Sequence, residues 1–291
     1  MEKQEHGDAK NAEIINGETE IVKQLTGETG GIIFSDTGGQ SRAYVIDGGR
    51  IVFKFPRFSS VKYDNEIKIL DAVNQIDSPL ARQKVGWKSP NGEYVGLYGV
   101  VGNPIANIEL SDGQADQIGA QIGEFLRKLH ALKVDDAYRL PLADEIKTLQ
   151  NERYLAYKDF FATRLTTDER QKLDDLMMKE MPKTLLKLGE DLVFSHGDMG
   201  DNNIYLAENG NAGIIDFTES GYLDRAADFM DLRNERVLSA MLDAYGADDV
   251  LRAKIAMRRK IRPVVHLLFS VLKNDQANIA KLIEQTKIVL Q

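Results

Sequence analysis

The chain has 291 residues and a net charge of −8, because 37 Lys and Arg stand against 45 Asp and Glu. Hydrophobic residues make up 43% and charged residues 28%, which is typical of one large folded domain or two modest ones. The absence of Cys excludes disulfides, thiolate metal sites and a Cys nucleophile. The acidic balance argues against nucleic acid as the main partner, since binding phosphates requires clustered Lys and Arg. It is compatible with a cationic ligand, or simply with solubility.

The N-terminal residues MEKQEHGDAKNAE are polar and acidic, unlike a secretory signal. The longest apolar stretch, Val264 to Leu272, is far shorter than the ~20 residues that span a bilayer. The sequence therefore predicts a cytoplasmic protein with no membrane partner.

The first hundred residues predict a small lobe rich in β-structure. An amphipathic segment, Ile14 to Leu25, comes first. Apolar residues at spacings of three and four predict one helix over 60–75, and Asp47-Gly48-Gly49 predicts a hairpin turn. Five short extended runs surround these features: 31–35, 42–46, 50–55, 83–87 and 94–101.

From residue 115 onward the pattern is mainly helical, with one interruption over 192–217 that predicts strand, loop, strand, turn and strand. Predicted helices cover a long segment that begins near 115, then 143–165, 167–188, 226–245, 248–273 and 276–289. The fold class is therefore α+β and bilobal. An N-terminal lobe over 1–101, with an antiparallel sheet and one helix, precedes a larger helical C-terminal lobe over 102–291. Ligand sites favour the cleft between two such lobes.

The segment SHGDMGDNN, residues 195–203, carries the clearest chemical signal, and Asp216 follows thirteen residues after Asn203. Asp198 can accept a proton from a hydroxyl, while Asn203 and Asp216 offer the hard oxygens that Mg²⁺ prefers. Phosphates would complete the metal's shell. Turns rich in Asp and Asn are common, but the combination with a hydrophobic strand that ends in Asp is far more specific.

The pattern His-Gly-Asp-x-x-x-x-Asn followed by Ile-Ile-Asp-Phe resembles the aminoglycoside phosphotransferase family, relatives of choline kinases with a protein-kinase-like fold. The other parts that phosphoryl transfer requires appear in the expected order. Lys54 lies in the third extended run and Glu66 on the one helix of the small lobe. Each has an ordinary structural explanation by itself, but their order and spacing over residues 31 to 232 favour the resemblance.

The resemblance implies a role for each matched residue. Lys54, held by Glu66, would contact the α and β phosphates of ATP or GTP. Mg²⁺ would bind Asn203 and Asp216, and Asp198 would be the catalytic base. The remaining nucleotide contacts would come from the loop residues Thr37, Gly38, Gly39 and Ser41. Backbone groups of Tyr98 and Val100, at the short connector predicted between the lobes near Gly99–Ile105, would add to them.

Three further residues are expected to hold the catalytic loop rather than to react. Asp224 and Asp228 resemble the Asp-x-Ala-x-Asp that follows the metal-binding Asp in aminoglycoside kinases. Asp224 is predicted to cap the next helix, and Asp228 to be a buried acceptor that orients the loop. His196 is expected to brace the loop.

The acceptor side carries a weaker signal. Glu219, Asp231 and Glu235 would surround the amines of a polycation, with Asp231 and Glu235 on one helix face; a solvated acidic face is the alternative. The run FKFPR resembles 2″-phosphotransferases, whereas the loop HGDMGDNN resembles 3′-phosphotransferases, so the phosphorylated position stays open. Met199-Gly200-Asp201 also replaces the Leu-His-Pro common in the wider family.

The resemblance implies transfer of the γ-phosphoryl group of ATP or GTP to a hydroxyl of a small polycation, foremost an aminoglycoside antibiotic in a resistance role. The alternatives are a metabolic kinase acting on a sugar derivative, an amino alcohol or a macrolide, and a nucleotide-binding pseudokinase. Against the pseudokinase, the sequence contains all five residues that the mechanism requires: Lys54, Glu66, Asp198, Asn203 and Asp216. The expected assembly is a monomer or homodimer.

Overall fold

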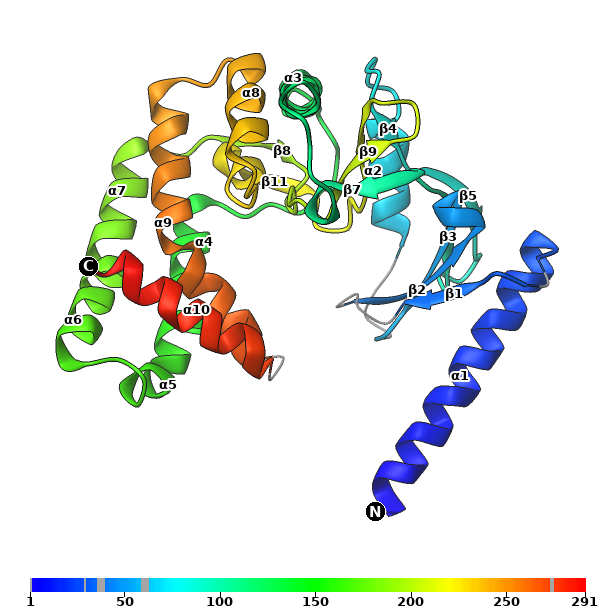
Figure 1. The fold of residues 1–291 in the computed structure, drawn as a ribbon, viewed down its shortest axis with the longest axis horizontal. Helices are drawn as coiled ribbons and strands as arrows, with labels where there is room; N and C mark the ends of the chain where they lie inside the picture. The colour runs from blue at the N-terminus through cyan, green and yellow to red at the C-terminus, as the bar shows by residue number, and fades with distance from the viewer. Residues whose placement is uncertain (1, 29, 36–39, 59–62, 273–274) are drawn as a thin grey trace. The chain divides into compact units, whose positions relative to one another are not determined.

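The computed structural model describes residues 2–28, 30–35, 40–58, 63–272 and 275–291, apart from the side chains of 2–11 and 272 (Figure 1). The chain forms two compact units, Met1–Ile108 with Ile204–Thr218, and Glu109–Asn203 with Glu219–Gln291. This division differs from the predicted lobes of 1–101 and 102–291 in two segments. Residues 102–108 and 204–218 both join the first unit, because they pair with each other as strands.

The first unit contains a five-stranded antiparallel sheet in the order β1-β2-β3-β6-β5. The strands are β1 (Ile33–Ser35), β2 (Ser41–Ile46), β3 (Ile51–Pro56), β5 (Lys84–Lys88) and β6 (Val95–Tyr98). Each of the five overlaps one predicted extended run, and β2, β3 and β5 each extend one residue beyond it. At the predicted hairpin turn, Asp47, Gly48 and Gly49 adopt positive φ angles of 49°, 62° and 95°. These left-handed conformations explain why Asp and Gly occupy the turn.

A second, four-stranded sheet of the same unit runs in the order β4-β10-β9-β7. It consists of β4 (Ala81–Arg82), β7 (Gly102–Pro104), β9 (Ile204–Ala207) and β10 (Ala212–Ile214), and β4 pairs with β10 in parallel. Sequence patterns missed β4, which has only two residues, and β7, whose Gly102 and Pro104 belong to residue types that are depleted in strands. A Cβ at Gly102 would lie 2.2 Å from the Leu206 carbonyl oxygen, so this close pairing requires glycine.

The two faces of the five-stranded sheet have different partners. Alternation along β2 puts Tyr44 on a face where Phe53 and Phe55 are buried. The C-terminal part of α1 (Glu2–Thr26) lies next to the sheet and packs Val22 against that face (Figure 1). Lys54 lies on the opposite face, toward α2 (Asp64–Val73). The predicted single helix of this lobe is α2, and α1 is a second helix that contains the predicted amphipathic segment.

The second unit is mainly helical. In it, α3 (Asp112–Leu129) packs along α8 (Glu235–Tyr245), and the other helices are α4 (Leu142–Lys147), α5 (Lys158–Ala162), α6 (Thr167–Asp175), α7 (Met181–Leu188), α9 (Asp249–Leu272) and α10 (Gln276–Val289). Short π-helical turns over Thr148–Tyr154 and Leu176–Glu180 lie within the predicted helices 143–165 and 167–188. The predicted helix over 226–245 is wrong in its first half, where Arg225–Phe229 is a 3₁₀ turn and α8 begins only at Glu235.

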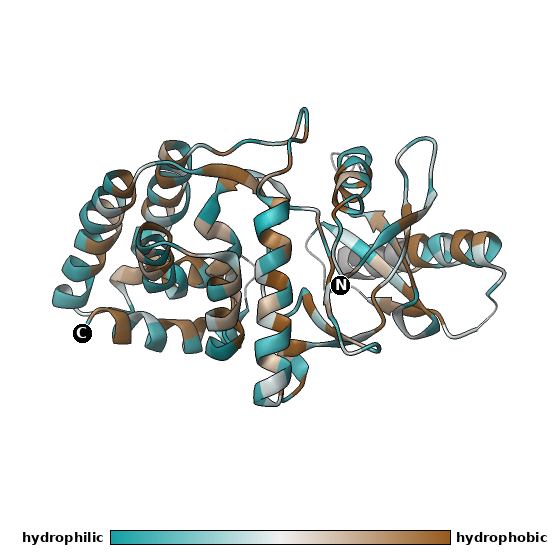
Figure 2. Ribbon diagram, turned by 90° about the horizontal axis from the view of Figure 1, so that it is seen from above, coloured by the Kyte–Doolittle hydropathy of each residue, from teal (hydrophilic) through white to brown (hydrophobic). Residues whose placement is uncertain are grey.

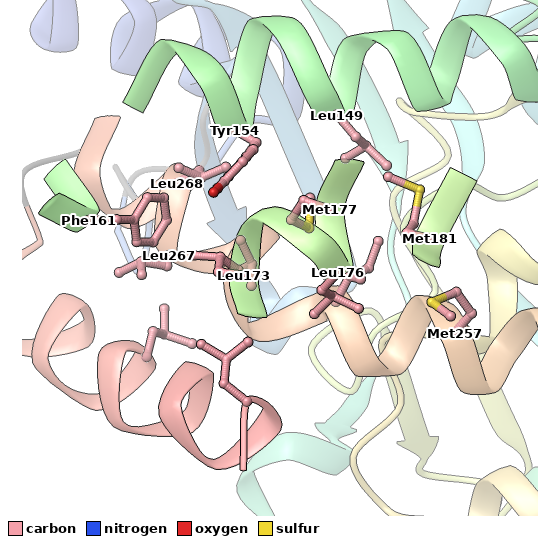
Figure 3. Close-up of a cluster of buried hydrophobic side chains, with 14 of the residues drawn as sticks. Leu149, Tyr154, Phe161, Leu173, Leu176, Met177, Met181, Met257, Leu267 and Leu268 are labelled. Carbon is pink, nitrogen blue, oxygen red and sulfur yellow. The ribbon is translucent and has the colours of Figure 1, made fainter. Parts of the chain in front are cut away.

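Buried side chains of several helices form one core in this unit (Figure 3). Met177 and Met181 lie among aromatic and aliphatic side chains that include Tyr154, Phe161 and Leu268. Figure 2 shows that the helices mix hydrophilic and hydrophobic residues, as amphipathic packing requires. No helix in the described part of the chain is both long and apolar enough to cross a membrane.

The second unit also holds a two-stranded antiparallel pair, β8 (Leu192–Ser195) with β11 (Gly221–Asp224). Sequence analysis predicted β8 and missed β11. The segment that carries the His-Gly-Asp pattern leaves β8 directly, so this pair fixes its starting point.

Candidate active site

In the first unit, Lys54 joins two carboxylates. Its Nζ donates to Glu66 Oε1 at 2.7 Å and to Asp216 Oδ1 at 2.9 Å. The Lys54 and Glu66 side chains are 10% and 3% exposed, whereas the Asp216 side chain is 41% exposed. The predicted contact between Lys54 and Glu66 is thus present, and Asp216 is a third member that faces solvent in part.

The charge of Lys54 is secured by these neighbours. Burial by itself would lower the pKa of Lys54, but the carboxylates of Glu66 and Asp216 together outweigh it and hold that pKa above its ordinary value. The ammonium group therefore stays protonated at every physiological pH. A fixed cation with one buried and one accessible carboxylate suits the binding of a polyanion through a bridging metal.

Asp216 owes its position to local geometry just beyond β10. Its φ of 65° is a left-handed conformation that is uncommon outside glycine, and its backbone N–H donates to Gln83 Oε1 at 2.8 Å. The Thr218 hydroxyl donates to Asp216 Oδ1 as well. These contacts hold a carboxylate in a strained, defined orientation, which is frequent at functional sites.

The other predicted nucleotide contacts have varied surroundings. Ser41 starts β2, and its hydroxyl lies 2.9 Å from that of Tyr63. Tyr98 ends β6 with 51% of its surface exposed, while Val100 is 6% exposed. Thr37, Gly38 and Gly39 lie outside the described residues.

In the second unit, the His-Gly-Asp segment brings Asp198 and Asn203 together. Asn203 Nδ2 donates to the Asp198 backbone oxygen and to Asp198 Oδ2, both at 2.8 Å. A Cβ at Gly197 would lie 2.3 Å from the Glu219 carbonyl oxygen, and Gly197 has a φ of 86°. The turn that presents Asp198 therefore requires glycine at this position.

Asp228 fixes the same loop from below, which confirms its predicted role as a buried acceptor. It is fully buried and accepts from the backbone N–H groups of His196 at 2.9 Å and Gly197 at 2.8 Å. His130 Nε2 lies 3.0 Å from Asp228 Oδ2, and His130 Nδ1 lies 2.9 Å from the Tyr245 hydroxyl. Burial alone would raise the pKa of Asp228, but the His130 hydrogen bond and nearby imidazoles and N–H groups lower it overall.

The contacts expected of Asp224 and His196 are also present. Asp224 accepts from the Ala226 N–H and caps the 3₁₀ turn that leads to Asp228, and the Asp198 N–H donates to His196 Nδ1 at 3.2 Å. His130 and Tyr245 were missed by sequence reasoning. Neither belongs to a local motif, and only the packing of α3 on α8 brings them to Asp228.

The predicted acceptor residues are not arranged as expected. Asp231 lies in the turn before α8, so the prediction that it shares a helix face with Glu235 is wrong. Arg262 Nε donates to Asp231 Oδ1 at 2.7 Å and His266 Nε2 lies 3.0 Å from it. Glu235 is paired with Arg259. Glu219 lies in the turn beside Gly197, where its carbonyl oxygen approaches that residue.

The described side chains of the two units include possible metal ligands, but few of them lie together. Within the described residues, no cluster of three or more His, Cys, Asp and Glu side chains forms a metal site by itself. Asp216 in the first unit carries a carboxylate and Asn203 in the second an amide oxygen, and both are ligand types of Mg²⁺, so their predicted role as ligands stays a prediction. A metal held through only one or two protein oxygens relies on substrate phosphates for the rest of its shell.

Comparisons with known proteins identify the family of this chain. Residues 35–263 match the model of a family described as the phosphotransferase enzyme family. An 84-residue segment is 32% identical to an aminoglycoside 3′-phosphotransferase of Enterococcus faecalis, which covers 26% of this chain and 30% of that relative.

Solved structures show the same fold over nearly the whole chain. The GDP and kanamycin complex of APH(2″)-IIIa has a TM-score of 0.74 at 19% identity, covering 94% of this chain and 98% of that one. Macrolide 2′-phosphotransferase MphH from Brachybacterium faecium, an apoenzyme, has a TM-score of 0.61 at 15% identity, covering 88% and 92%. The architecture is therefore that of protein-kinase-like phosphotransferases, as the sequence predicted.

Proposed function

The chain belongs to the phosphotransferase enzyme family, and we propose that it transfers the γ-phosphoryl group of ATP or GTP to a hydroxyl of a small molecule. The observation that carries this proposal is the Lys54–Glu66–Asp216 cluster in a chain that also holds Asp198 on a loop fixed by Asp228. Phosphoryl transfer needs mainly positioning and charge stabilisation, and these residues supply both.

On the donor side, Lys54 binds the α and β phosphates while Glu66 holds its ammonium in place. Asp216 and Asn203 are the residues that would hold Mg²⁺, which when bound neutralises charge on the phosphate oxygens. Ser41 and the loop residues Thr37, Gly38 and Gly39 cover the phosphates. Backbone groups of Tyr98 and Val100 bind the nucleobase edge.

On the acceptor side, Asp198 is the general base. It orients the acceptor hydroxyl and takes its proton while the oxygen forms a bond to phosphorus and the bond from phosphorus to the nucleotide oxygen breaks. Asn203 restrains the Asp198 side chain through its 2.8 Å hydrogen bond to Asp198 Oδ2. His196 and Asp228 act on the loop and not on the substrate.

For the acceptor itself we propose an aminoglycoside as the first candidate, with a resistance role in the cytoplasm. The support is the matched segment of an aminoglycoside 3′-phosphotransferase and the likeness in fold to an enzyme solved with kanamycin. Glu219, Asp231 and Glu235 would then face the amines of the antibiotic.

A second candidate acceptor is a hydroxylated metabolite or macrolide that carries little positive charge. The pairing of Asp231 with Arg262 and of Glu235 with Arg259 favours it, because these carboxylates already have counter-ions. Asp201 in the catalytic loop is likewise bound by Arg233. A polycation would have to displace arginines to reach these groups.

The test is Mg²⁺-dependent consumption of ATP and of GTP with kanamycin, a macrolide and a set of hydroxylated metabolites. Turnover with kanamycin, and a KM that rises steeply with salt, supports the first candidate because screening weakens attraction between clustered charges. Turnover with a weakly charged acceptor and a salt-independent KM supports the second. Nucleotide binding without turnover of any acceptor would refute the proposed transfer.

A further inference from the structure

The first two residues of β2 are held from opposite faces of the sheet. Ser41 pairs with Pro56 and Arg42 with Phe55, so Ser41 shares the face of Lys54 while Arg42 shares the outer face. Arg42 Nε donates to Glu18 Oε2 of α1 at 2.9 Å, and Arg42 Nη2 donates to the Pro56 carbonyl oxygen at 2.9 Å. The backbone that carries Ser41 is thereby fixed from the α1 side.

On the Lys54 face, Tyr63 contacts Ser41 directly. The two hydroxyl oxygens are 2.9 Å apart, and Tyr63 is only 1% exposed. Tyr63 stands just before α2, where its carbonyl oxygen accepts from the Ile67 N–H at 2.9 Å. Glu66, three residues later, reaches Lys54. The first turn of α2 therefore positions both Ser41 and Lys54.

The direction of the hydrogen bond between Tyr63 and Ser41 determines what Ser41 can bind. Burial raises the pKa of Tyr63 to about 12, so its phenol keeps its proton at neutral pH. When the phenol donates to Ser41 Oγ, the Ser41 hydroxyl retains its own proton for an anionic acceptor. When Ser41 donates to the phenol instead, that proton is used, and an anion near Ser41 meets only oxygen lone pairs.

We propose that Tyr63 is a positioning residue for nucleotide binding, whose hydroxyl donates to Ser41 and directs the Ser41 proton toward a nucleotide phosphate. The inference rests on the proposed function, because it takes Ser41 as a phosphate contact. It adds a residue outside the nucleotide loop and predicts that Tyr63 acts only through Ser41.

A double-mutant cycle on nucleotide affinity tests this prediction. The dissociation constant of Mg²⁺ with a fluorescent ATP analogue is measured for the wild type, Tyr63→Phe, Ser41→Ala and the double variant. Each single substitution removes one hydrogen bond of a shared network, so each is expected to weaken binding by about 3- to 10-fold. The double variant is expected to bind no worse than Ser41→Ala.

The controls separate orientation from folding. Phe keeps the buried ring of Tyr63, and thermal denaturation checks that the variant is folded. Tyr154→Phe removes a phenol of the second unit, where Tyr154 donates to Asp174 Oδ1 at 2.7 Å, and its effect on affinity should be unchanged by Ser41→Ala.

The outcomes distinguish the inference from the function on which it rests. Additive effects of Tyr63→Phe and Ser41→Ala, or no effect of either on affinity, would overturn the role of Tyr63 while the wild type still binds nucleotide. A wild type that binds neither ATP nor GTP would overturn the proposed function itself, and the inference with it.

Discussion

At the scale of single residues, buried charge is placed where it fixes a functional group. Asp228 accepts hydrogen bonds from the backbone N–H groups of His196 and Gly197 in the His-Gly-Asp loop. Rotation of this loop would therefore take hydrogen bonds away from a buried carboxylate. Glu66 holds Lys54 in the same manner. Asp198 is exposed and the Asp216 side chain is 41% exposed, which fits the substrate contacts proposed for them.

The role of Asp198 can be separated from that of Asp216. Asp198→Asn should lower kcat by about 10²- to 10⁴-fold, because a positioned general base is lost. It should leave Mg²⁺-nucleotide affinity unchanged. Asp216→Asn should weaken that affinity. Steady-state kinetics with nucleotide titrations measure both effects, and near-full kcat in Asp198→Asn would show that another group is the base.

Asp228 gives a prediction for pH. Its folded pKa lies below the ordinary value of 3.8, so its contribution to stability is complete above that pH and is lost as the pH falls through the folded pKa. Asp228→Asn should lower the free energy of unfolding by about 3–5 kcal/mol at neutral pH, because it removes one partner of a buried charged network. Denaturant unfolding of both proteins at several pH values should show this cost shrinking below pH 3.8. A cost that stays constant into stronger acid would contradict the assignment.

At the scale of elements, small residues decide how closely helices approach. A Cβ at Gly119 would lie 2.4 Å from the Val237 carbonyl oxygen, and one at Gly123 would lie 2.3 Å from that of Met241. These glycines let α3 lie against the backbone of α8. That contact brings His130, just past the end of α3, to Tyr245 at the end of α8.

The close contact between α3 and α8 predicts that two Gly→Ala substitutions in α3 change the stability of the protein in opposite directions. Gly119→Ala should destabilise the protein by about 1–3 kcal/mol, because the clash with backbone outweighs the better helix propensity of Ala. A Cβ added at Gly113 would have no atom within 4 Å, so Gly113→Ala should stabilise the protein by up to about 1 kcal/mol. Chemical denaturation of the two variants measures both, and a stabilising Gly119→Ala would show that α3 and α8 are not in close contact.

Elements also show which local signals were reliable. Most strands of four or more residues and helices with a long apolar face were predicted within a few residues, because their periodicity is visible in a short window. The exception among these strands is β11, which has four residues and was missed. The helix predicted over 226–245 was too long because Asp224 caps a 3₁₀ turn and Asn234 then caps α8 separately. Two adjacent caps look like one continuous helix when only hydrophobic spacing is counted.

At the scale of the whole molecule, the chain builds its first unit from two separate segments. Residues 204–218 leave the second unit and supply β9, β10 and Asp216 to the unit that contains Lys54. Lys54 and Asp216 are 162 residues apart in sequence and bond at 2.9 Å. The nucleotide site proposed around Lys54 thus depends on a segment that follows the His-Gly-Asp loop.

This arrangement predicts how nucleotide changes global stability. Mg²⁺ with ATP or GTP, at about 100 times the dissociation constant, should stabilise the folded chain by about 2.7 kcal/mol. Asp216→Asn should reduce the part of this gain that requires Mg²⁺. Thermal denaturation with and without EDTA measures it, and an unchanged Mg²⁺-dependent gain in the variant would exclude Asp216 as a ligand.

The sequence by itself determined the α+β architecture and the order of the principal elements, and it predicted the residues that are proposed to carry the chemistry. It could do so because these features are local: a repeat of apolar residues, a turn that needs glycine, a short motif with fixed spacing. Asp228 was also found this way, since it lies in a motif four residues after Asp224.

Only the tertiary structure decided which distant side chains meet. It paired His130 with Asp228, Arg42 with Glu18 and Tyr63 with Ser41, and it gave Asp231 and Glu235 their arginine partners. Such contacts join residues from 22 to 98 positions apart. They depend on how whole elements pack, and no short window of sequence contains both partners.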